Sequence, residues 1–180
     1  MPRQAGARKT APRTLALRAD AVLSGCMIWE GRLEHIHIAP AASQPMQSLA
    51  EAVLVAGRGI EGDRYKLGTG TYSPRPDIRE VTLIEAEALE ALERDYRVTL
   101  LPHEHRRNLT TLGVPLNHLV GRRFRVGACV LEGGRLNVPC QYLEDLLGKK
   151  VFKPLMHRSG LNCRIVEGGT IRVGDAIRPL

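Results

Sequence analysis

The sequence lacks any apolar run that approaches the roughly 18 residues needed to cross a membrane as a helix. Apolar residues make up 43% of the chain and charged residues 25%, which is ordinary for a globular protein. The moderately apolar segment from Leu15 to Trp29 is interrupted by Arg18 and Asp20, which argues against a secretory signal. We therefore expect a cytoplasmic protein that does not associate with a membrane.

Cysteine is scarce and scattered. The chain has four cysteines, and no two of them are spaced as C-x-x-C: they are Cys26, Cys129, Cys140 and Cys163. This usage suits a reducing compartment, so we expect free thiols. There is also no four-cysteine iron–sulfur pattern and no flavin fingerprint.

Aromatic residues are few, at 4% of the chain, and the positive charge is unevenly distributed. Residues 1–19 contain five basic residues and no acidic one, so they supply +5 of the net +7 and leave only +2 for the rest. A nucleic-acid adaptor usually carries a basic patch on its folded part. We therefore do not expect nucleic acid as a partner.

The basic N-terminal segment admits several readings: a disordered arm, a nucleic-acid contact, an organellar presequence or an over-long gene start. We expect a solvent-exposed tail that has only a minor role in function. A chain of 180 residues fits one domain with a good core. We expect residues 1–20 to be a basic, disordered segment and residues 21–180 to form a single domain.

Short strands dominate the predicted secondary structure. Alternating polar and apolar residues predict a half-buried strand at 32–38. Apolar segments bounded by glycine turns predict further strands at 52–56, 81–84, 124–132, 135–137, 162–166, 171–173 and 176–178. A helical period predicts a helix over about 85–96 and short helical turns at 116–120 and 151–156. This pattern predicts a mainly β fold, a small β-barrel with a few peripheral helices.

Two glycine-containing loops are candidates for a role in ligand binding. Three glycines between residues 57 and 62 imply a tight turn, either a plain hairpin or an anion-binding loop with Arg58 or Arg64 as charge partner. No Gly-Lys-Ser/Thr and no helical pattern follows, so this is neither a P-loop nor a dinucleotide fingerprint. Residues 66–79 are too rich in turn formers for regular structure and are a candidate mobile lid.

Two histidine pairs raise the question of a metal site. His35 and His37 share the polar face of the first predicted strand, where solvent exposure is the favoured reading. His103 and His105 belong to a run of six polar residues, 103–108, that ordinarily forms a solvated loop. Neither pair has further ligands at suitable spacing, so we expect no metal centre of this kind.

The sequence around Cys140 places a thiol, a reactive group, at a position that can change its pKa. Leu143, Leu146 and Leu147 form one apolar helical stripe, and Gly148 is a natural helix terminator. A helix therefore begins at or just after Cys140, where unsatisfied backbone N–H groups favour the thiolate. A buried packing role is the alternative. We expect Cys140, alone among the four cysteines, to be reactive.

Five short motifs in order resemble the MOSC domain, which is found at the C-terminus of molybdenum cofactor sulfurases. They cover about residues 30–180 and read GIEGDRY (59–65), RRNL (106–109), LVGRRFRVG (119–127), PCxxL (139–143) and GTIRVGD (169–175). The resemblance implies a mainly β, barrel-like fold. It also marks the cysteine at position 140 as the key residue.

The resemblance implies two functions. The first is a small molybdoenzyme that reduces N-hydroxylated compounds, with Cys140 as the catalytic residue and as the molybdenum ligand of a pyranopterin (molybdopterin) cofactor. The second is a carrier that holds persulfide sulfur or the cofactor on Cys140 without turnover. In the first, Arg64, Arg107 and Arg158 are expected to bind the cofactor phosphate, and Asn108 the edges of the pterin.

The expected partners follow from the same resemblance. Reductases of the family often have an additional β-rich region or an attached electron-transfer domain, and this sequence shows no such motif. Electrons are therefore expected from a separate electron-transfer protein, or sulfur from a cysteine desulfurase-type donor. The substrate is expected to be a small molecule.

A truncated chain that starts at Ala21 should melt within a few degrees of the full chain. The removed segment concentrates like charge and has no compelling apolar period, so it should contribute little to the free energy of unfolding. Thermal unfolding of both chains checks this, and a large loss of stability would mean that the segment packs on the domain.

Overall fold

The computed structural model describes residues 28–75 and 77–180. The predicted tail at 1–20 and Cys26 lie outside the described residues, so what the sequence predicts for them stays a prediction.

The described chain is built mainly from short strands. The first half contains β1 (Gly31–Ile38), β2 (Gln47–Leu49), β3 (Glu51–Val55), β4 (Gly59–Ile60), β5 (Val81–Glu85), the helix α2 (Ala86–Tyr96) and β6 (Leu109–Leu112). The second half contains a 3-10 turn (Leu116–His118), β7 (Arg123–Val126), β8 (Cys129–Leu136), the helix α3 (Gln141–Leu147), β9 (Leu161–Glu167), β10 (Gly169–Arg172) and β11 (Ala176–Pro179).

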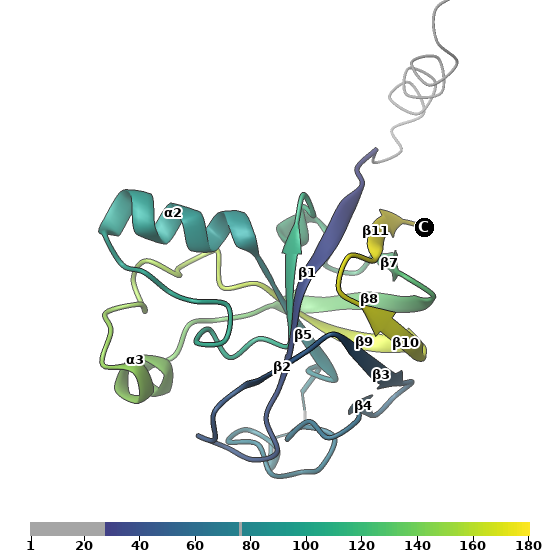
Figure 1. Ribbon diagram of the computed structural model, residues 1–180, viewed down its shortest axis with the longest axis horizontal. Helices are drawn as coiled ribbons and strands as arrows, with labels where there is room; N and C mark the ends of the chain where they lie inside the picture. Colours follow the sequence, from purple (N-terminus) through teal and green to yellow (C-terminus); the bar gives the residue numbers. More distant parts are fainter. Residues whose placement is uncertain (1–27, 76) are drawn as a thin grey trace, which may run out of the picture.

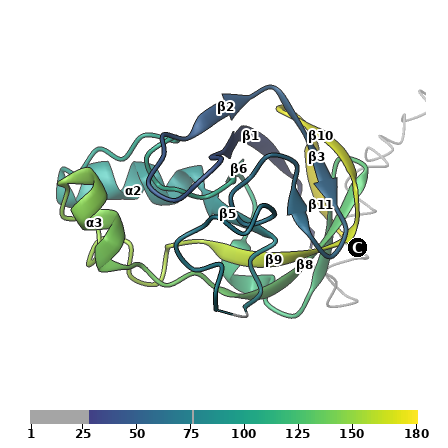
Figure 2. The ribbon, with the colours of Figure 1, turned by 90° about the horizontal axis from the view of Figure 1, so that it is seen from below.

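Seven of the described strands close a barrel in the order β11, β7, β8, β9, β5, β6 and β1. Closure follows because β1 pairs with β6 on one side and with β11 on the other. The barrel is mixed, since β5 and β6 run parallel and the other neighbours antiparallel. The strands β10, β3 and β4 form a separate small sheet. Figures 1 and 2 show both helices on one side of the barrel, so the prediction of a mainly β barrel with peripheral helices is confirmed.

Two apolar clusters hold these elements together. The barrel interior is filled by fully buried side chains such as Leu83 of β5, Phe124 of β7 and Leu131 of β8. A second cluster, which includes Leu92 of α2 and Leu143 of α3, packs the helices against the barrel. Each such side chain contributes about 1.5–3 kcal/mol when fully buried. In α2 the buried residues are Ala88 and Leu92, which lie four positions apart, as the helical period of the sequence predicts.

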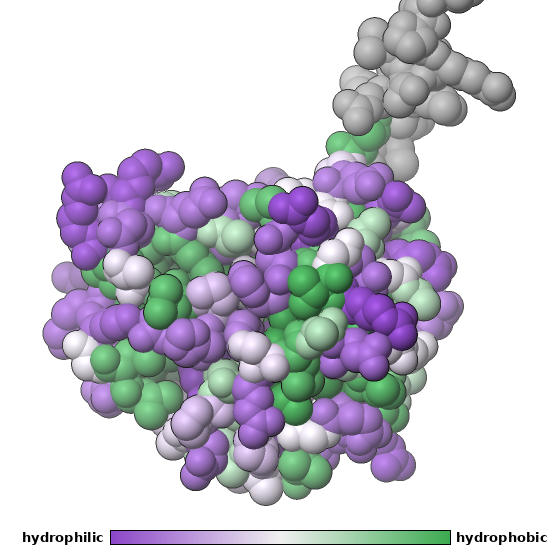
Figure 3. All heavy atoms as spheres, viewed as in Figure 1, coloured by the Kyte–Doolittle hydropathy of each residue, from purple (hydrophilic) through white to green (hydrophobic). Residues whose placement is uncertain are grey.

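The face of the molecule seen in Figure 3 is mostly polar. Figure 3 shows hydrophilic side chains over most of one face, with hydrophobic ones in smaller patches between them. Among the described residues, no helix combines the length and the apolarity that crossing a membrane requires.

The prediction of two strands at 124–132 and 135–137 joined by a glycine turn is wrong. The turn lies earlier, at Gly127 with φ +54°, and β8 continues through Gly133 and Gly134, with a register shift against β9 between Gly133 and Arg135. Side chains are excluded there by close packing rather than by turn geometry. A Cβ at Gly133 would lie 2.1 Å from the carbonyl oxygen of Leu119, and one at Gly134 would lie 2.4 Å from Cγ2 of Ile78.

The second part of the polar run before β6, residues 105–108, is buried, contrary to the expectation of a solvated loop, whereas His103 is exposed. The Asn108 side chain is fully buried and joins three parts of the fold. Its Oδ1 accepts from the backbone N–H of Thr82 (3.2 Å) and the Thr82 hydroxyl (2.9 Å), while its Nδ2 donates to the carbonyl of His37 (3.2 Å) and to Oδ1 of Asp63 (3.1 Å). These bonds link β5, β1 and the loop after β4. They satisfy polar groups that would otherwise be costly to bury.

One member of each histidine pair departs from the expectation of solvent exposure, while His103, like His35, is exposed. His35 is exposed, but His37 and His105 are buried, and their rings lie 6.3 Å apart. The Nε2 atom of His105 is 2.9 Å from the Thr110 hydroxyl, and its Nδ1 accepts the backbone N–H of Arg107. In the described part of the chain, no three His, Cys, Asp or Glu side chains are grouped as a metal site.

Gly160→Ala should destabilise the protein strongly. Gly160 has φ +97°, and a Cβ there would lie 1.9 Å from the carbonyl oxygen of Leu83. The matched control is Gly148, which ends α3 with φ +63° and has no heavy atom within 4 Å of the place that a Cβ would occupy. We expect Gly148→Ala to cost about 1–2 kcal/mol from the backbone alone, and Gly160→Ala at least about 3 kcal/mol. Equal costs in urea unfolding would show that the contact with Leu83 relaxes freely.

Acid should destabilise the fold through the buried histidines. Burial, followed by the nearby His35 and His103, lowers the pKa of His37 from 6.5 to about 4. The native state therefore prefers the neutral ring, so its stabilisation is present above pH 6.5 and is lost as the pH falls towards 4. His37→Leu should make the melting temperature less sensitive to pH over this window, whereas the exposed His35→Leu should change it little. An unchanged slope for His37→Leu would contradict this assignment.

Candidate functional site

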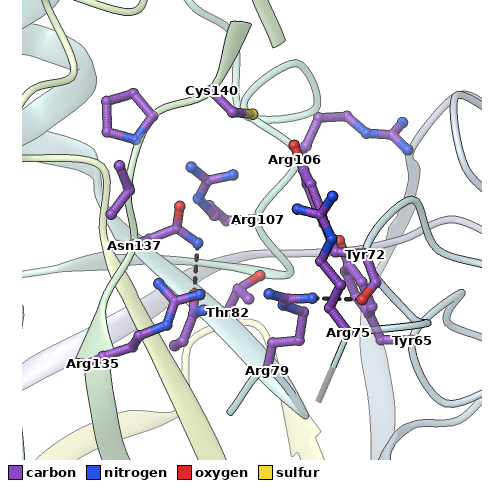
Figure 4. Close-up of a pocket in the computed structure, with 13 residues that line it drawn as sticks. Tyr65, Tyr72, Arg75, Arg79, Thr82, Arg106, Arg107, Arg135, Asn137 and Cys140 are labelled. Carbon is purple, nitrogen blue, oxygen red and sulfur yellow. Dashed lines mark hydrogen bonds between the residues drawn. The ribbon is translucent and has the colours of Figure 1, made fainter. Parts of the chain in front are cut away.

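A cavity of about 530 Å³ lies beside Cys140. Its walls come from the turn-rich segment 65–79, from the turn before β6, and from the end of β8 with the connection to α3. Figure 4 shows side chains from these segments converging on the cavity, with the Cys140 sulfur at one end. Segments far apart in the sequence therefore build one site.

Cys140 occupies the position immediately before α3. Its backbone is extended (φ −136°, ψ 150°), its carbonyl accepts the N–H of Leu143 at 3.1 Å, and Gly148 ends the helix as the sequence predicts. The side chain is half-buried, whereas Cys129 and Cys163 are completely buried. Burial makes both of these thiols inaccessible, and it raises their pKa, so they stay protonated. Among the described cysteines, Cys140 is the one placed to react.

The cavity is strongly positive. Five arginines line it, and no carboxylate is among the described lining residues: they are Arg75, Arg79, Arg106, Arg107 and Arg135. Such a concentration of one sign of charge in a partly enclosed space attracts anions. The cavity is therefore suited to a negatively charged ligand.

Arg107 is the most deeply placed of these arginines. It is 7% exposed, and it donates to the carbonyl and hydroxyl of Ser159 (3.0 and 2.7 Å) and to the carbonyl of His105 (3.2 Å). Burial lowers the pKa of Arg107 to about 10. The guanidinium therefore keeps its charge at neutral pH and contributes positive potential near the sulfur.

Tyr72 brings a hydroxyl to the Cys140 side chain. Burial, followed by a hydrogen bond with Cys140, raises the pKa of Tyr72 to about 12. Its ring meets the Tyr142 ring edge-on at 6.5 Å, and the Arg79 guanidinium lies 5.3 Å from the Tyr72 ring centre. The Tyr72 hydroxyl is thus held in place and stays protonated at neutral pH.

The predicted cofactor ligands are distributed unequally. Arg107 lines the cavity, and Arg64 lines a small adjoining one of about 40 Å³ that also reaches Cys140. Arg64 is buried, with its guanidinium 3.1 Å from the Asp63 carboxylate and 2.9 Å from the carbonyl of Arg106. The four hydrogen bonds of the Asn108 side chain all lie within the fold, and this side chain lines neither cavity.

Arg158 is placed elsewhere. Its guanidinium lies 3.5 Å from the Asp95 carboxylate of α2, in a separate hollow that also involves Trp29 and Glu85. The turn after Leu155 directs the chain this way, since the Arg158 N–H donates to the Leu155 carbonyl at 3.0 Å. The structure does not bring Arg158 together with Cys140.

Several residues of the cavity are not identifiable from the sequence. Tyr72, Arg75 and Arg79 lie in the segment that the sequence predicts as a lid, Arg106 neighbours Arg107, and Arg135 precedes the Cys140 stretch. The only sequence signal is the density of arginine in turn-rich segments. Their convergence depends on strand pairings between distant residues, which local patterns do not reveal.

Solved structures with similar folds include bacterial proteins. The YuaD protein of Bacillus subtilis is similar with a TM-score of 0.69 and 19% identity, over 83% of this chain and 97% of that one. YiiM of Geobacillus stearothermophilus has a TM-score of 0.64 and 14% identity, over 83% and 75% of the two chains. YiiM of Escherichia coli has a TM-score of 0.61 and 16% identity, over 83% and 69%.

Sequence comparison with curated proteins finds no match. A comparison with models of protein families, in contrast, gives a clear assignment. The model of the MOSC domain matches residues 74–178, a segment that contains most of the cavity wall together with Cys140. Because this match covers more than half of the chain, the protein belongs to the MOSC domain family.

Proposed function

We propose that this MOSC domain protein binds the molybdenum cofactor with Cys140 as the metal ligand and reduces N-hydroxylated small molecules. The MOSC domain family is associated with the molybdenum cofactor. The observation that carries the proposal is one accessible thiol at the end of a cavity lined by five arginines and no described carboxylate.

The side chains of the cavity fit such a cofactor. A thiolate is a soft ligand of the kind that binds transition metals with sulfur-rich coordination. Planar guanidinium groups such as those of Arg106 and Arg107 match the oxygens of a phosphate. Asn137 and Asn162, joined by a hydrogen bond of 2.6 Å, place amide groups in the wall that can meet the polar edges of a pterin. These residues replace Arg158 and Asn108 in our assignment of the site.

The chain's own residues have defined tasks in this proposal. Tyr72 donates its hydroxyl proton towards the Cys140 sulfur and, because its pKa is about 12, acts as a donor and not as a base at neutral pH. Arg107 supplies fixed positive charge near the Cys140 sulfur. When bound, the cofactor supplies the two-electron chemistry that removes oxygen from an N–OH group. A separate electron-transfer protein is the proposed source of the electrons.

A second candidate function is sulfur carriage. The small cavity of about 40 Å³ behind Cys140, lined in part by Arg64, Arg106 and Arg107, favours it. This volume exceeds the roughly 10–15 Å³ that one water molecule needs, so it can accept the outer sulfur of a persulfide on Cys140. In that case a cysteine desulfurase-type donor is the proposed partner, and the protein transfers sulfur or cofactor without turnover.

Cys140→Ser should remove metal or sulfur from the protein without unfolding it, since the hydroxyl fits the same position but is a poor ligand and cannot form a persulfide. The full chain and the variant would be purified from a molybdenum-replete host, and molybdenum would be measured by mass spectrometry. Persulfide would be measured after incubation with a cysteine desulfurase and cysteine. Cys26→Ser is the matched control and should behave like the parent.

The outcomes separate the two functions. Molybdenum in the parent and its loss in Cys140→Ser support the reductase, whereas persulfide on Cys140 without molybdenum supports the carrier. In the metal-free protein, Cys140 should react with iodoacetamide before Cys129 and Cys163. A serine variant that keeps its metal or sulfur would rule out both functions for this residue.

A further inference from the structure

We propose that the end of the cavity away from Cys140 is a second anion site, which selects substrates that carry a phosphate monoester. This far end is formed by Arg79 and Arg135, with Arg75 in the adjoining wall. The inference rests on the proposed function, because it assumes that the thiol end is the reacting end. It adds a substrate class that the thiol chemistry alone does not specify.

The two guanidinium groups are held in position before any ligand binds. Asp77 accepts from Nε of Arg135 at 3.0 and 3.1 Å and from Arg79 at 2.5 Å, so one carboxylate bridges both side chains. Arg79 also donates to the Tyr72 carbonyl at 2.8 Å. Figure 4 shows Arg79 and Arg135 at the opposite end of the drawn cavity from Cys140. Nη1 of Arg135 also donates to the Leu136 carbonyl at 3.0 Å, so both guanidinium groups are fixed by internal acceptors, although the Arg135 side chain is 41% exposed.

The far end carries more positive charge than its own carboxylate balances. The guanidinium groups of Arg79 and Arg135 both face the carboxylate of Asp77. The hydrogen bond from Arg135 and the nearby charge of Arg79 lower the pKa of Asp77 to about 2, so this carboxylate is ionised at neutral pH. The Arg75 side chain makes no hydrogen bond or ion pair within the described residues, although it lines the same cavity. About two positive charges therefore remain for a ligand. Uncompensated charge in a partly enclosed site is unfavourable until an anion arrives.

A phosphate monoester balances this remaining positive charge better than a carboxylate does. It carries a charge of roughly −1.5 to −2 at neutral pH and three acceptor oxygens, which matches two remaining charges and several N–H donors. The cofactor itself has one phosphate. Arg106 and Arg107, near Cys140, already provide two charges for that group. The far end is therefore available for the substrate.

The test is calorimetric binding of glycerol phosphate, with glycerol as its neutral counterpart, to the full chain purified from a molybdenum-replete host. Glycerol phosphate should bind and glycerol should not. Arg75→Gln and Arg135→Gln should each weaken binding by roughly tenfold, which is the effect of losing one charge-assisted hydrogen bond. Arg75→Gln breaks no described internal contact of the side chain, so it remains informative if Arg135→Gln fails to fold. Arg125→Gln, an exposed position on β7, is the matched control and should bind like the parent.

Molybdenum content is measured on the same samples. Weakened phosphate binding with unchanged molybdenum supports a substrate site. A parallel loss of molybdenum in Arg75→Gln or Arg135→Gln would overturn the proposal, because the far end would then hold the cofactor. Equal affinity in parent and variants would also overturn it. If the parent contains no molybdenum but phosphate binding still depends on Arg75, the proposed redox function fails while the anion site stands.

Discussion

The hydrogen bonds of one buried side chain, Asn108, join the parts of the fold on which the site depends. They connect β1 through the His37 carbonyl, β5 through Thr82, and the loop after β4 through Asp63. Asp63 in turn accepts from Arg64, whose other nitrogen reaches the carbonyl of Arg106. In a low-dielectric interior an unmade bond in this network would be costly, so the geometry of the turn before β6 is closely determined.

This turn explains why positive charge can be concentrated beside a thiol. Arg106 has a left-handed backbone (φ +65°), which directs it and Arg107 to different surroundings on the same cavity. Arg107 is stabilised by carbonyl and hydroxyl acceptors and not by a carboxylate. Its charge is therefore solvated by dipoles and remains effective towards an anion in the cavity. The same principle applies at the far end, where one carboxylate serves two arginines.

Periodicity in the sequence is a good guide to most elements and a poor guide to the β7–β8 hairpin. Strand β1 and helix α2 are predicted nearly to their ends. In α2 the apolar pattern matches one buried face, whereas in β1 a register shift between Leu33 and His35 interrupts the alternation, so that His37 is buried. The hairpin is misplaced because Gly133 and Gly134 look like a turn in sequence. They are glycines because Leu119 and Ile78 approach the strand too closely for a side chain.

The sequence by itself determined the barrel class and the helix that follows Cys140, because these depend on local patterns and short motifs. Only the tertiary structure decided which arginines accompany the thiol. Arg79 and Arg135 lie far apart in sequence yet share the carboxylate of Asp77, whereas Arg158, nearer to Cys140 in sequence than Arg79 is, pairs with Asp95. Strand pairing sets these distances, and a polar side chain gives no local signal of which distant strand it will face.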